Sequence, residues 1–239
     1  GRIICELTFK ALNYYLELLS PDCLSELRKK MVTSLIRGKQ FYSNRLLGKY
    51  WRVILDGTGV ACFEERHCDN CLYEKRTYKD GRKVTVYYHK VLEAKLILGD
   101  KIVVSLGTEF IENERSDVSK QDCETKAAKR LLERIKKEYP RLPICIQGDA
   151  MYATEPMMEI CRLNGWKYIF SHKEAQQRVL ADNYNLLSLE DGKQKVQGIG
   201  AEKGTAIYCN GIGKMAGKTE IMNVYEYTCK KIIKKQEKT

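Results

Sequence analysis

The sequence predicts an α/β fold, and three observations lead to this prediction. Apolar residues recur at helical spacing before residue 48, short runs rich in β-branched and aromatic residues follow, and an amphipathic helical stretch separates two of these runs. From residue 50 the expected order is strand, antiparallel strands, basic helix, strand, helix, strand. Such an order favours a mixed sheet flanked by helices.

The beginning of the chain predicts two helices. Ser20-Pro21 separates them, because serine caps a helix and proline fits its first position. We expect a helical N-terminal segment over residues 1–48. The apolar positions at helical spacing are Leu12, Tyr15, Leu16, Leu19, Leu24, Leu27, Met31 and Leu35.

The next region favours strands. Residues 51–55 form an apolar run that we expect to be a buried strand, ended by a turn at 56–59 where glycines follow Asp56. Residues 84–88, 92–98 and 101–106 are rich in Val, Ile, Tyr and Thr, with a Gly99-Asp100 turn before the last run. These runs predict paired antiparallel strands.

The remainder alternates between helix and strand. Ser119 with Asp122 is a candidate helix cap, and Tyr139-Pro140 ends the helix that follows. After residue 173 the chain becomes Gly-rich, polar and strand-like. The elements expected are a helix with the apolar stripe Cys123, Ala127, Leu131 and Ile135, a strand at 143–147, a helix between Thr154 and Gly165, a strand at 166–170 and a strand-like stretch at about 178–229.

Composition narrows the partners and the compartment. The net charge of +11, from 42 Lys and Arg against 31 Asp and Glu, suits a polyanion such as nucleic acid, although a well-hydrated surface explains it equally well. No stretch approaches the roughly 18 apolar residues of a membrane helix, and the N-terminus lacks a signal-peptide pattern. The ten cysteines are scattered, which favours a reducing compartment. We therefore expect a cytoplasmic protein without a membrane partner.

Two aspartates follow directly on predicted buried strands. Asp56 comes after the first strand and Asp149 after the strand at 143–147. Residues just past the carboxyl ends of buried strands are where α/β folds place chemistry, because the strand fixes the backbone while the loop exposes the side chain. A turn-forming Asp beside Gly is the alternative explanation, and from these positions alone it is the more common one.

A set of motifs around these aspartates resembles the catalytic domain of DDE-type transposases from bacterial insertion sequences. The resemblance runs from about residue 50 to 175 and implies a ribonuclease H-like fold, a mixed five-stranded sheet flanked by helices. The motifs that carry it are Ile54-Leu55-Asp56-Gly57-Thr58-Gly59, His67-Cys68-x-x-Cys71-Leu72, Tyr88-His89-Lys90-Val91-Leu92-Glu93-Ala94-Lys95, Lys120-Gln121-Asp122-Cys123-Glu124 and Leu142-Pro143-Ile144-Cys145-x-x-Gly148-Asp149-x-x-Tyr152-Ala153.

The resemblance implies DNA strand cleavage and strand transfer. Enzymes of this type use three carboxylates to hold two divalent metals, Mg²⁺ or Mn²⁺, for in-line phosphoryl transfer. Asp56 matches the first acid and Asp149 the second, so both are the expected catalytic and metal-binding residues. The implied partners are the transposon ends and the target DNA, with a homodimer as one arrangement of the full-length protein, in the bacterial cytoplasm. The implied segments are a helical part at 1–48, a catalytic core at 49–176 and a β-rich insertion at 177–239.

The third acid of this family is absent from the chain. It is a Glu on a helix after the insertion, preceded by Tyr seven and Arg four residues earlier. The Glu residues that lack this pattern are Glu174, Glu190, Glu202, Glu220, Glu226 and Glu237. Because the chain also begins at Gly1 without Met, we expect a piece of a longer protein, truncated before the catalytic Glu and impaired in transposition.

Three soft ligands and a basic helix face complete the candidate sites. Cys68 and Cys71 have the spacing of half a zinc site, and His89 with one further ligand such as Cys62 would extend it, although a lone CxxC is more often structural or incidental. The candidate DNA-binding side chains on the amphipathic helix are Lys126, Lys129, Arg130 and Lys137, for which a solvated face is the more common explanation.

Two other functions stay open from the sequence. One is a ribonuclease H-like nuclease that only hydrolyses DNA, because it would share the same metal chemistry. The other is a catalytically inert DNA-binding remnant of a transposase, as the missing acid suggests.

Overall fold

A computed structural model describes residues 9–65, 67–116, 118–173, 177–199, 203–213 and 221–229. The chain divides into two compact units, Gly1–Ser171 and His172–Thr239, which are described separately. The segment boundaries predicted at residues 48 and 176 stay predictions. Four of the glutamates checked for the third acid lie outside the described residues, namely Glu174, Glu202, Glu220 and Glu237.

The N-terminal residues form the expected helices, α1 (Phe9–Leu18) and α2 (Pro21–Arg37), followed by the short 3-10 helix η1 (Tyr42–Asn44). The hydroxyl of Ser20 accepts a hydrogen bond from the Asp22 N–H, so it caps α2 as predicted. Arg28 of α2 forms an ion pair of 3.3 Å with Glu138, and α2 packs against a strand of the sheet. Most apolar side chains of α1 and α2 are nevertheless exposed.

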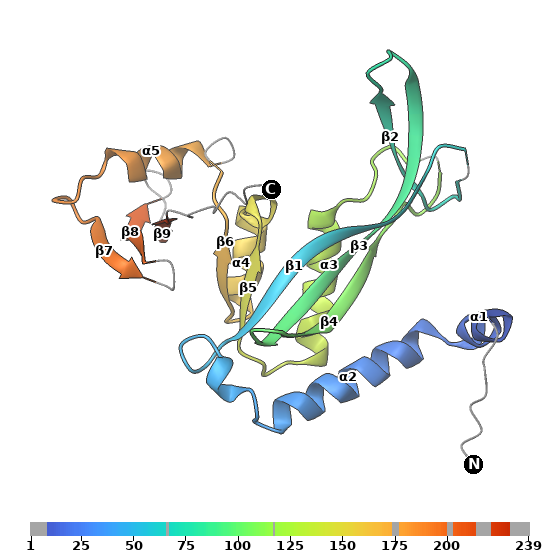
Figure 1. Cartoon of the computed structure of the whole chain (residues 1–239), viewed down its shortest axis with the longest axis horizontal. Helices are drawn as coiled ribbons and strands as arrows, with labels where there is room; N and C mark the ends of the chain where they lie inside the picture. The colour runs from blue at the N-terminus through green and yellow to red at the C-terminus, as the bar shows by residue number, and fades with distance from the viewer. Residues whose placement is uncertain are drawn as a thin grey trace, which may run out of the picture. The chain divides into compact units, whose positions relative to one another are not determined.

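A mixed sheet forms the centre of the first unit (Figure 1). Its neighbours run in the order β2-β3-β1-β5-β6, and β4 pairs with β3 as well. The pairs of β1 with β5 and of β5 with β6 are parallel, and the others are antiparallel. The strands are β1 (Trp51–Phe63), β2 (Leu72–Thr77), β3 (Lys83–Gly99), β4 (Ile102–Ile111), β5 (Ile144–Gly148) and β6 (Lys167–Phe170). The predicted α/β class with a mixed sheet flanked by helices is confirmed, with six strands where five were expected.

The first strand is longer than predicted. The turn expected at 56–59 is wrong, because β1 continues through these residues to Phe63. The reason is its partner β3, a single strand of 17 residues that pairs with β1 from Arg52↔Ile97 to Phe63↔Tyr87. This long partner satisfies the backbone groups of the glycine-containing segment, which local propensity alone assigns to a turn. Asp56 consequently lies within β1, opposite Glu93.

The amphipathic helix α3 (Glu124–Glu138) packs on β3 and β4. Of its predicted stripe, Ala127, Leu131 and Ile135 are fully buried, whereas Cys123 precedes the helix and is exposed. The helix cap predicted at Ser119 and Asp122 is wrong. The residue that precedes the helix is Cys123, whose side chain forms no capping hydrogen bond, and the Asp122 carboxylate binds Arg130 of the helix instead. A side-chain ion pair has therefore replaced the local capping bond.

The rest of the first unit follows the prediction. Strand β5 leads through the 3-10 helix η2 (Ala150–Tyr152) into α4 (Glu155–Leu163), and β6 closes the parallel part of the sheet. Gly165 has a positive φ of 69°, which suits the chain reversal after α4. Helix α4 packs against β6 (Figure 1).

The second unit contains a helix that the sequence pattern did not reveal. Its elements are α5 (Arg178–Leu186) and a three-stranded sheet of β7 (Gln194–Ile199), β8 (Gly204–Gly213) and β9 (Ile221–Thr228). Leu180 and Tyr184 of α5 pack with Cys209 and Ile212 of β8 in a small core. Among the helices described across both units, none is long and apolar enough to span a membrane.

Candidate functional site

The two predicted catalytic aspartates lie at the same level of two neighbouring parallel strands, Asp56 within β1 and Asp149 directly after the end of β5. In the register of β1 with β5, Ile54 lies opposite Gln147, and each aspartate follows two residues later in its own strand direction. Because side chains alternate between the faces of a strand, this register directs Asp56 and Asp149 to the same face. Both side chains are exposed, as ligands for a cation from solvent need to be.

Each aspartate has a local partner that orients it. The Asp56 carboxylate lies 3.7 Å from the ammonium of Lys95, which also approaches Glu93 at 3.9 Å. The Asp149 carboxylate accepts a hydrogen bond of 2.9 Å from the backbone N–H of Met151, and this bond caps η2. The end of β5 therefore leads into a short turn that holds the second aspartate by its own backbone.

A further carboxylate, Glu124, lies near these residues but on the other face of the sheet. A Cβ built on Gly57 would lie 2.5 Å from the Glu124 carboxylate, and neighbouring residues of a strand point to opposite faces, so Glu124 lies on the face away from the Asp56 side chain. The Tyr152 hydroxyl donates a hydrogen bond of 2.8 Å to Glu124, and Lys90 forms an ion pair with it. Glu124 thus links β1 at Gly57 to the η2 turn that follows β5.

The pKa of Tyr152 reports the charge of all three acids. It is raised above its ordinary value by burial, by the hydrogen bond to Glu124, and by the negative charges of Glu124, Asp149 and Asp56. These carboxylates are not a compact cluster, because the only described group of three or more metal-type donors within 4.8 Å lies elsewhere in the sheet. A hard cation such as Mg²⁺ keeps several water ligands, so it tolerates such spacing.

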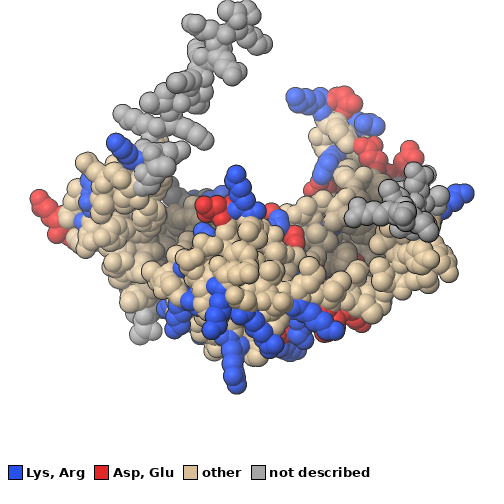
Figure 2. Space-filling model, turned by 60° about the horizontal axis from the view of Figure 1, so that its bottom comes forward, with Lys and Arg blue, Asp and Glu red and all other residues tan. Residues whose placement is uncertain are grey.

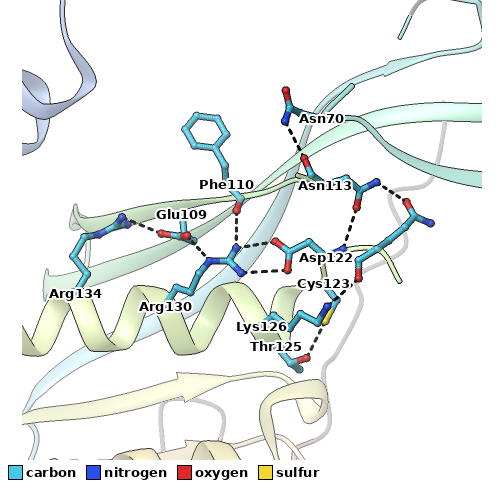
Figure 3. Close-up of polar contacts among 11 residues, drawn as sticks. Asn70, Glu109, Phe110, Asn113, Asp122, Cys123, Thr125, Lys126, Arg130 and Arg134 are labelled. Atoms are coloured by element: carbon cyan, nitrogen blue, oxygen red, sulfur yellow. Dashed lines mark hydrogen bonds and ion pairs between the residues drawn. The ribbon is translucent and has the colours of Figure 1, made fainter. Parts of the chain in front are cut away.

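A network of ion pairs fixes the beginning of α3 and hence the position of Glu124 (Figure 3). The Arg130 guanidinium binds Asp122 at 2.7 Å, Glu109 at 2.7 Å and the Phe110 carbonyl at 3.1 Å. Burial opposes ionisation of Asp122, but its hydrogen bonds with Arg130 and backbone N–H groups outweigh this and hold its pKa below the ordinary value. The loop before α3 is thereby tied to β4.

Asn113 links this loop to the segment before β2. It is the buried polar side chain of the described core, with 2% exposure. Its amide donates to the Cys71 carbonyl at 2.8 Å, and its side-chain oxygen accepts from the Asp122 N–H at 3.1 Å. Asn70 forms two further hydrogen bonds with the Asn113 backbone. The loop that carries Cys71 and the beginning of α3 therefore share one buried anchor.

The three soft ligands predicted from the sequence do come together. Cys68 Sγ lies 3.5 Å from Cys71 Sγ, and His89 Nε2 lies 3.5 Å and 3.4 Å from the two sulfurs. Cys71 is buried, His89 half-buried and Cys68 exposed. Cys62, the suggested fourth ligand, pairs with Tyr88 in the register of β1 with β3, so its side chain points to the face opposite His89.

The predicted DNA-binding side chains of α3 are all exposed but differ in their partners. Arg130 is held by two carboxylates, and Lys126 donates to the Gln121 carbonyl at 3.4 Å. Lys129 and Lys137 form none of the ion pairs found among the described residues. Figure 2 shows Lys and Arg side chains gathered on the displayed face with few acidic side chains between them.

Comparisons of the chain with family models, with curated proteins and with solved structures each returned no match. The resemblance to transposases consequently stays a prediction. Glu124, which contacts Gly57 and Tyr152 behind the two aspartates, is the neighbouring acid that the sequence reasoning did not single out, although it stands in one of the motifs that carry the resemblance. The signal was an acid in the first turn of a helix that packs on the sheet.

Proposed function

We propose that the first unit catalyses metal-dependent phosphoryl transfer on DNA, with a ribonuclease H-like fold of the kind used by insertion-sequence transposases. The observation that supports the proposal is the parallel pairing of β1 with β5, whose register brings Asp56 and Asp149 to the same level and directs them to the same face. The strand order β4-β3-β1-β5-β6, with α3 between β4 and β5 in the chain, is compatible with this fold.

The donor set fits hard divalent cations. Two exposed carboxylates offer the oxygen ligands that Mg²⁺ and Mn²⁺ prefer, and water oxygens would complete the shell. When bound, two such ions activate the attacking oxygen and stabilise the leaving oxygen of an in-line displacement. Asp56 and Asp149 would hold them, and Lys95 would keep Asp56 oriented towards the site.

A second candidate function is hydrolysis of DNA without strand transfer. The pairing of β1 with β5 relates Asp56 and Asp149 without any Glu from further along the chain, and hydrolysis uses the same metal chemistry. Nicking by this chain would then proceed, while joining of transposon ends would be impaired.

Both proposed functions require divalent metal at Asp56 and Asp149, so binding of Mn²⁺ tests them together. We expect the purified chain to bind Mn²⁺. Binding is measured as the decrease of the free Mn²⁺ signal in electron paramagnetic resonance. Asp56→Asn and Asp149→Asn should each weaken this binding. Asp100→Asn is the matched control, because Asp100 is an exposed aspartate in the β3–β4 turn. Wild-type protein that binds no Mn²⁺, or binding unchanged in both variants, contradicts the proposal.

A nicking assay then separates the two functions. With supercoiled plasmid and Mg²⁺ or Mn²⁺, Asp149→Asn should reduce nicking roughly 100-fold or more, since several kcal/mol of transition-state stabilisation depend on the metals. Joining of labelled terminal-repeat DNA to a target by the same chain favours the transposase. Nicking without joining favours the hydrolytic nuclease.

A further inference from the structure

The geometry points to a zinc site at Cys68, Cys71 and His89, separate from the carboxylate edge and serving to fix the chain segment before β2. Three residues from two parts of the chain supply it. Cys68 and Cys71 lie in the turn that enters β2, and His89 lies in the middle of β3. We propose that Zn²⁺ binds there with three protein ligands and one exchangeable ligand such as water.

The distances between the donor atoms match those of a tetrahedral site. With Zn–S near 2.3 Å and Zn–N near 2.0 Å, tetrahedral geometry places two sulfurs about 3.8 Å apart and a sulfur and a nitrogen about 3.6 Å apart. The three observed separations are 3.5, 3.5 and 3.4 Å. The donors therefore stand within a few tenths of an ångström of their zinc-bound positions, which makes the site pre-formed.

The strand register explains why these residues meet. Leu72 lies opposite Tyr88 in the antiparallel pair of β2 with β3, so Cys71, one residue earlier, stands next to His89. The turn then brings Cys68 back: the Cys71 N–H donates to the Cys68 carbonyl at 3.2 Å, and the Cys68 N–H donates to the Cys71 sulfur at 3.3 Å. A backbone N–H directed at a sulfur stabilises the thiolate that zinc requires.

The neighbouring soft ligands are engaged elsewhere. The His67 ring stacks on Tyr87 with a centroid distance of 4.3 Å and an interplanar angle of 15°. Cys62 lies on the face opposite His89. Within the described part of the chain no fourth His, Cys, Asp or Glu donor joins the group within 4.8 Å. Among the described residues, the fourth position is therefore left to solvent or to a bound molecule.

Zinc at this point would reinforce a junction of the fold. The Cys71 carbonyl accepts the amide of buried Asn113, which also holds the Asp122 N–H before α3. A metal that pins Cys68 and Cys71 to His89 would therefore tie the β2 turn, β3 and the beginning of α3 together. Loss of the metal should loosen residues 67–77 and leave the parallel strands β5 and β6 unchanged.

Metal analysis tests the site directly. Protein purified in reductant without chelator should contain one zinc per chain, and replacement by Co²⁺ should give the absorption of a tetrahedral thiolate complex. Cys68→Ser and His89→Gln should each lose most of the zinc. Cys23→Ser is the matched control because Cys23 is exposed on α2, and Cys62→Ser should also keep full occupancy. Zinc that is absent from wild-type protein, or retained in both ligand variants, overturns the proposal.

Thiol mapping gives a readout that does not depend on a variant folding. Cys68 is exposed, so without a metal it should be alkylated as readily as Cys23 and Cys123. We expect Cys68 to be protected in untreated protein and alkylated after a zinc chelator is added, with Cys23 alkylated in both. Rapid alkylation of Cys68 before chelation contradicts the site. These measurements involve no DNA, so their outcome is independent of the proposed phosphoryl transfer.

Discussion

Replacement of Asn113 by alanine should destabilise the first unit by several kcal/mol. The side chain is 2% exposed, and it serves two backbone groups at once, the Cys71 carbonyl at 2.8 Å and the Asp122 N–H at 3.1 Å. A buried polar group left without a partner costs about 1–3 kcal/mol, and Asn113→Ala leaves two of them. We therefore expect a loss of about 2–4 kcal/mol in the free energy of unfolding, allowing for partial access of water.

Tryptophan fluorescence during urea denaturation measures this change in the relevant unit. The chain has two tryptophans, Trp51 and Trp166, and both are buried in the first unit. Asn13→Ala is the control, because Asn13 is exposed on α1 and its replacement should change stability by less than about 0.5 kcal/mol. A loss below about 1 kcal/mol for Asn113→Ala would refute the reasoning, since both backbone groups would then have found other partners.

Three further predictions follow from the same contacts. Gly57→Ala places a Cβ 2.5 Å from the Glu124 carboxylate and should displace Glu124 and lower the free energy of unfolding in urea, whereas Gly59→Ala, with open space around its Cβ, should not. The pKa of Asp122 is held below its ordinary value of 3.8 in the folded protein. The charged carboxylate therefore stabilises the fold at pH values above 3.8, and this stabilisation is lost as the pH falls through the lowered pKa. Urea denaturation should accordingly show Asp122→Asn to be less stable than wild type at neutral pH, with the difference shrinking in acid. The double variant Lys129→Ala/Lys137→Ala should reduce the slope of log K for DNA binding against log salt concentration by about one to two. Fluorescence anisotropy measures this slope, and an unchanged slope would exclude both lysines from the DNA contact.

The regular elements of the first unit could be predicted because local pattern and tertiary packing agree there. The stripe of Ala127, Leu131 and Ile135 is spaced for one helix face, and that face is the one buried on the sheet. The apolar run at β5 was predicted as a buried strand for the same reason, and Ile144 and Ile146 are fully buried. The buried strand predicted at residues 166–170 is wrong in its burial, because β6 lies at the edge of the sheet and its side chains are exposed or half-buried.

The misplaced boundaries depend on contacts that local propensity does not encode. Gly57 and Gly59 signal a turn locally, but pairing with β3, a strand distant in the chain, keeps them extended. Asp122 has the composition of a helix cap, yet Arg130, eight residues further on, binds its carboxylate.

The residues of the candidate site likewise divide into those that the sequence pattern reveals and those that only the fold reveals. Asp56 and Asp149 could be selected because each follows an apolar run, and the spacing of Cys68 and Cys71 is itself a local signal. Glu124 could not, because its relation to the site depends on where α3 begins and on the missing side chain of Gly57. That contact joins residues 67 positions apart in the chain, 124 − 57, and only the packed sheet and helix create it.

Diffraction from crystals soaked in Mn²⁺, recorded at a wavelength where manganese scatters anomalously, tests the central claim most directly. The account predicts manganese bound where the pairing of β1 with β5 ends, with carboxylate oxygens of both Asp56 and Asp149 among its ligands. Manganese held by only one of these residues, or found only at other positions on the chain, would contradict it.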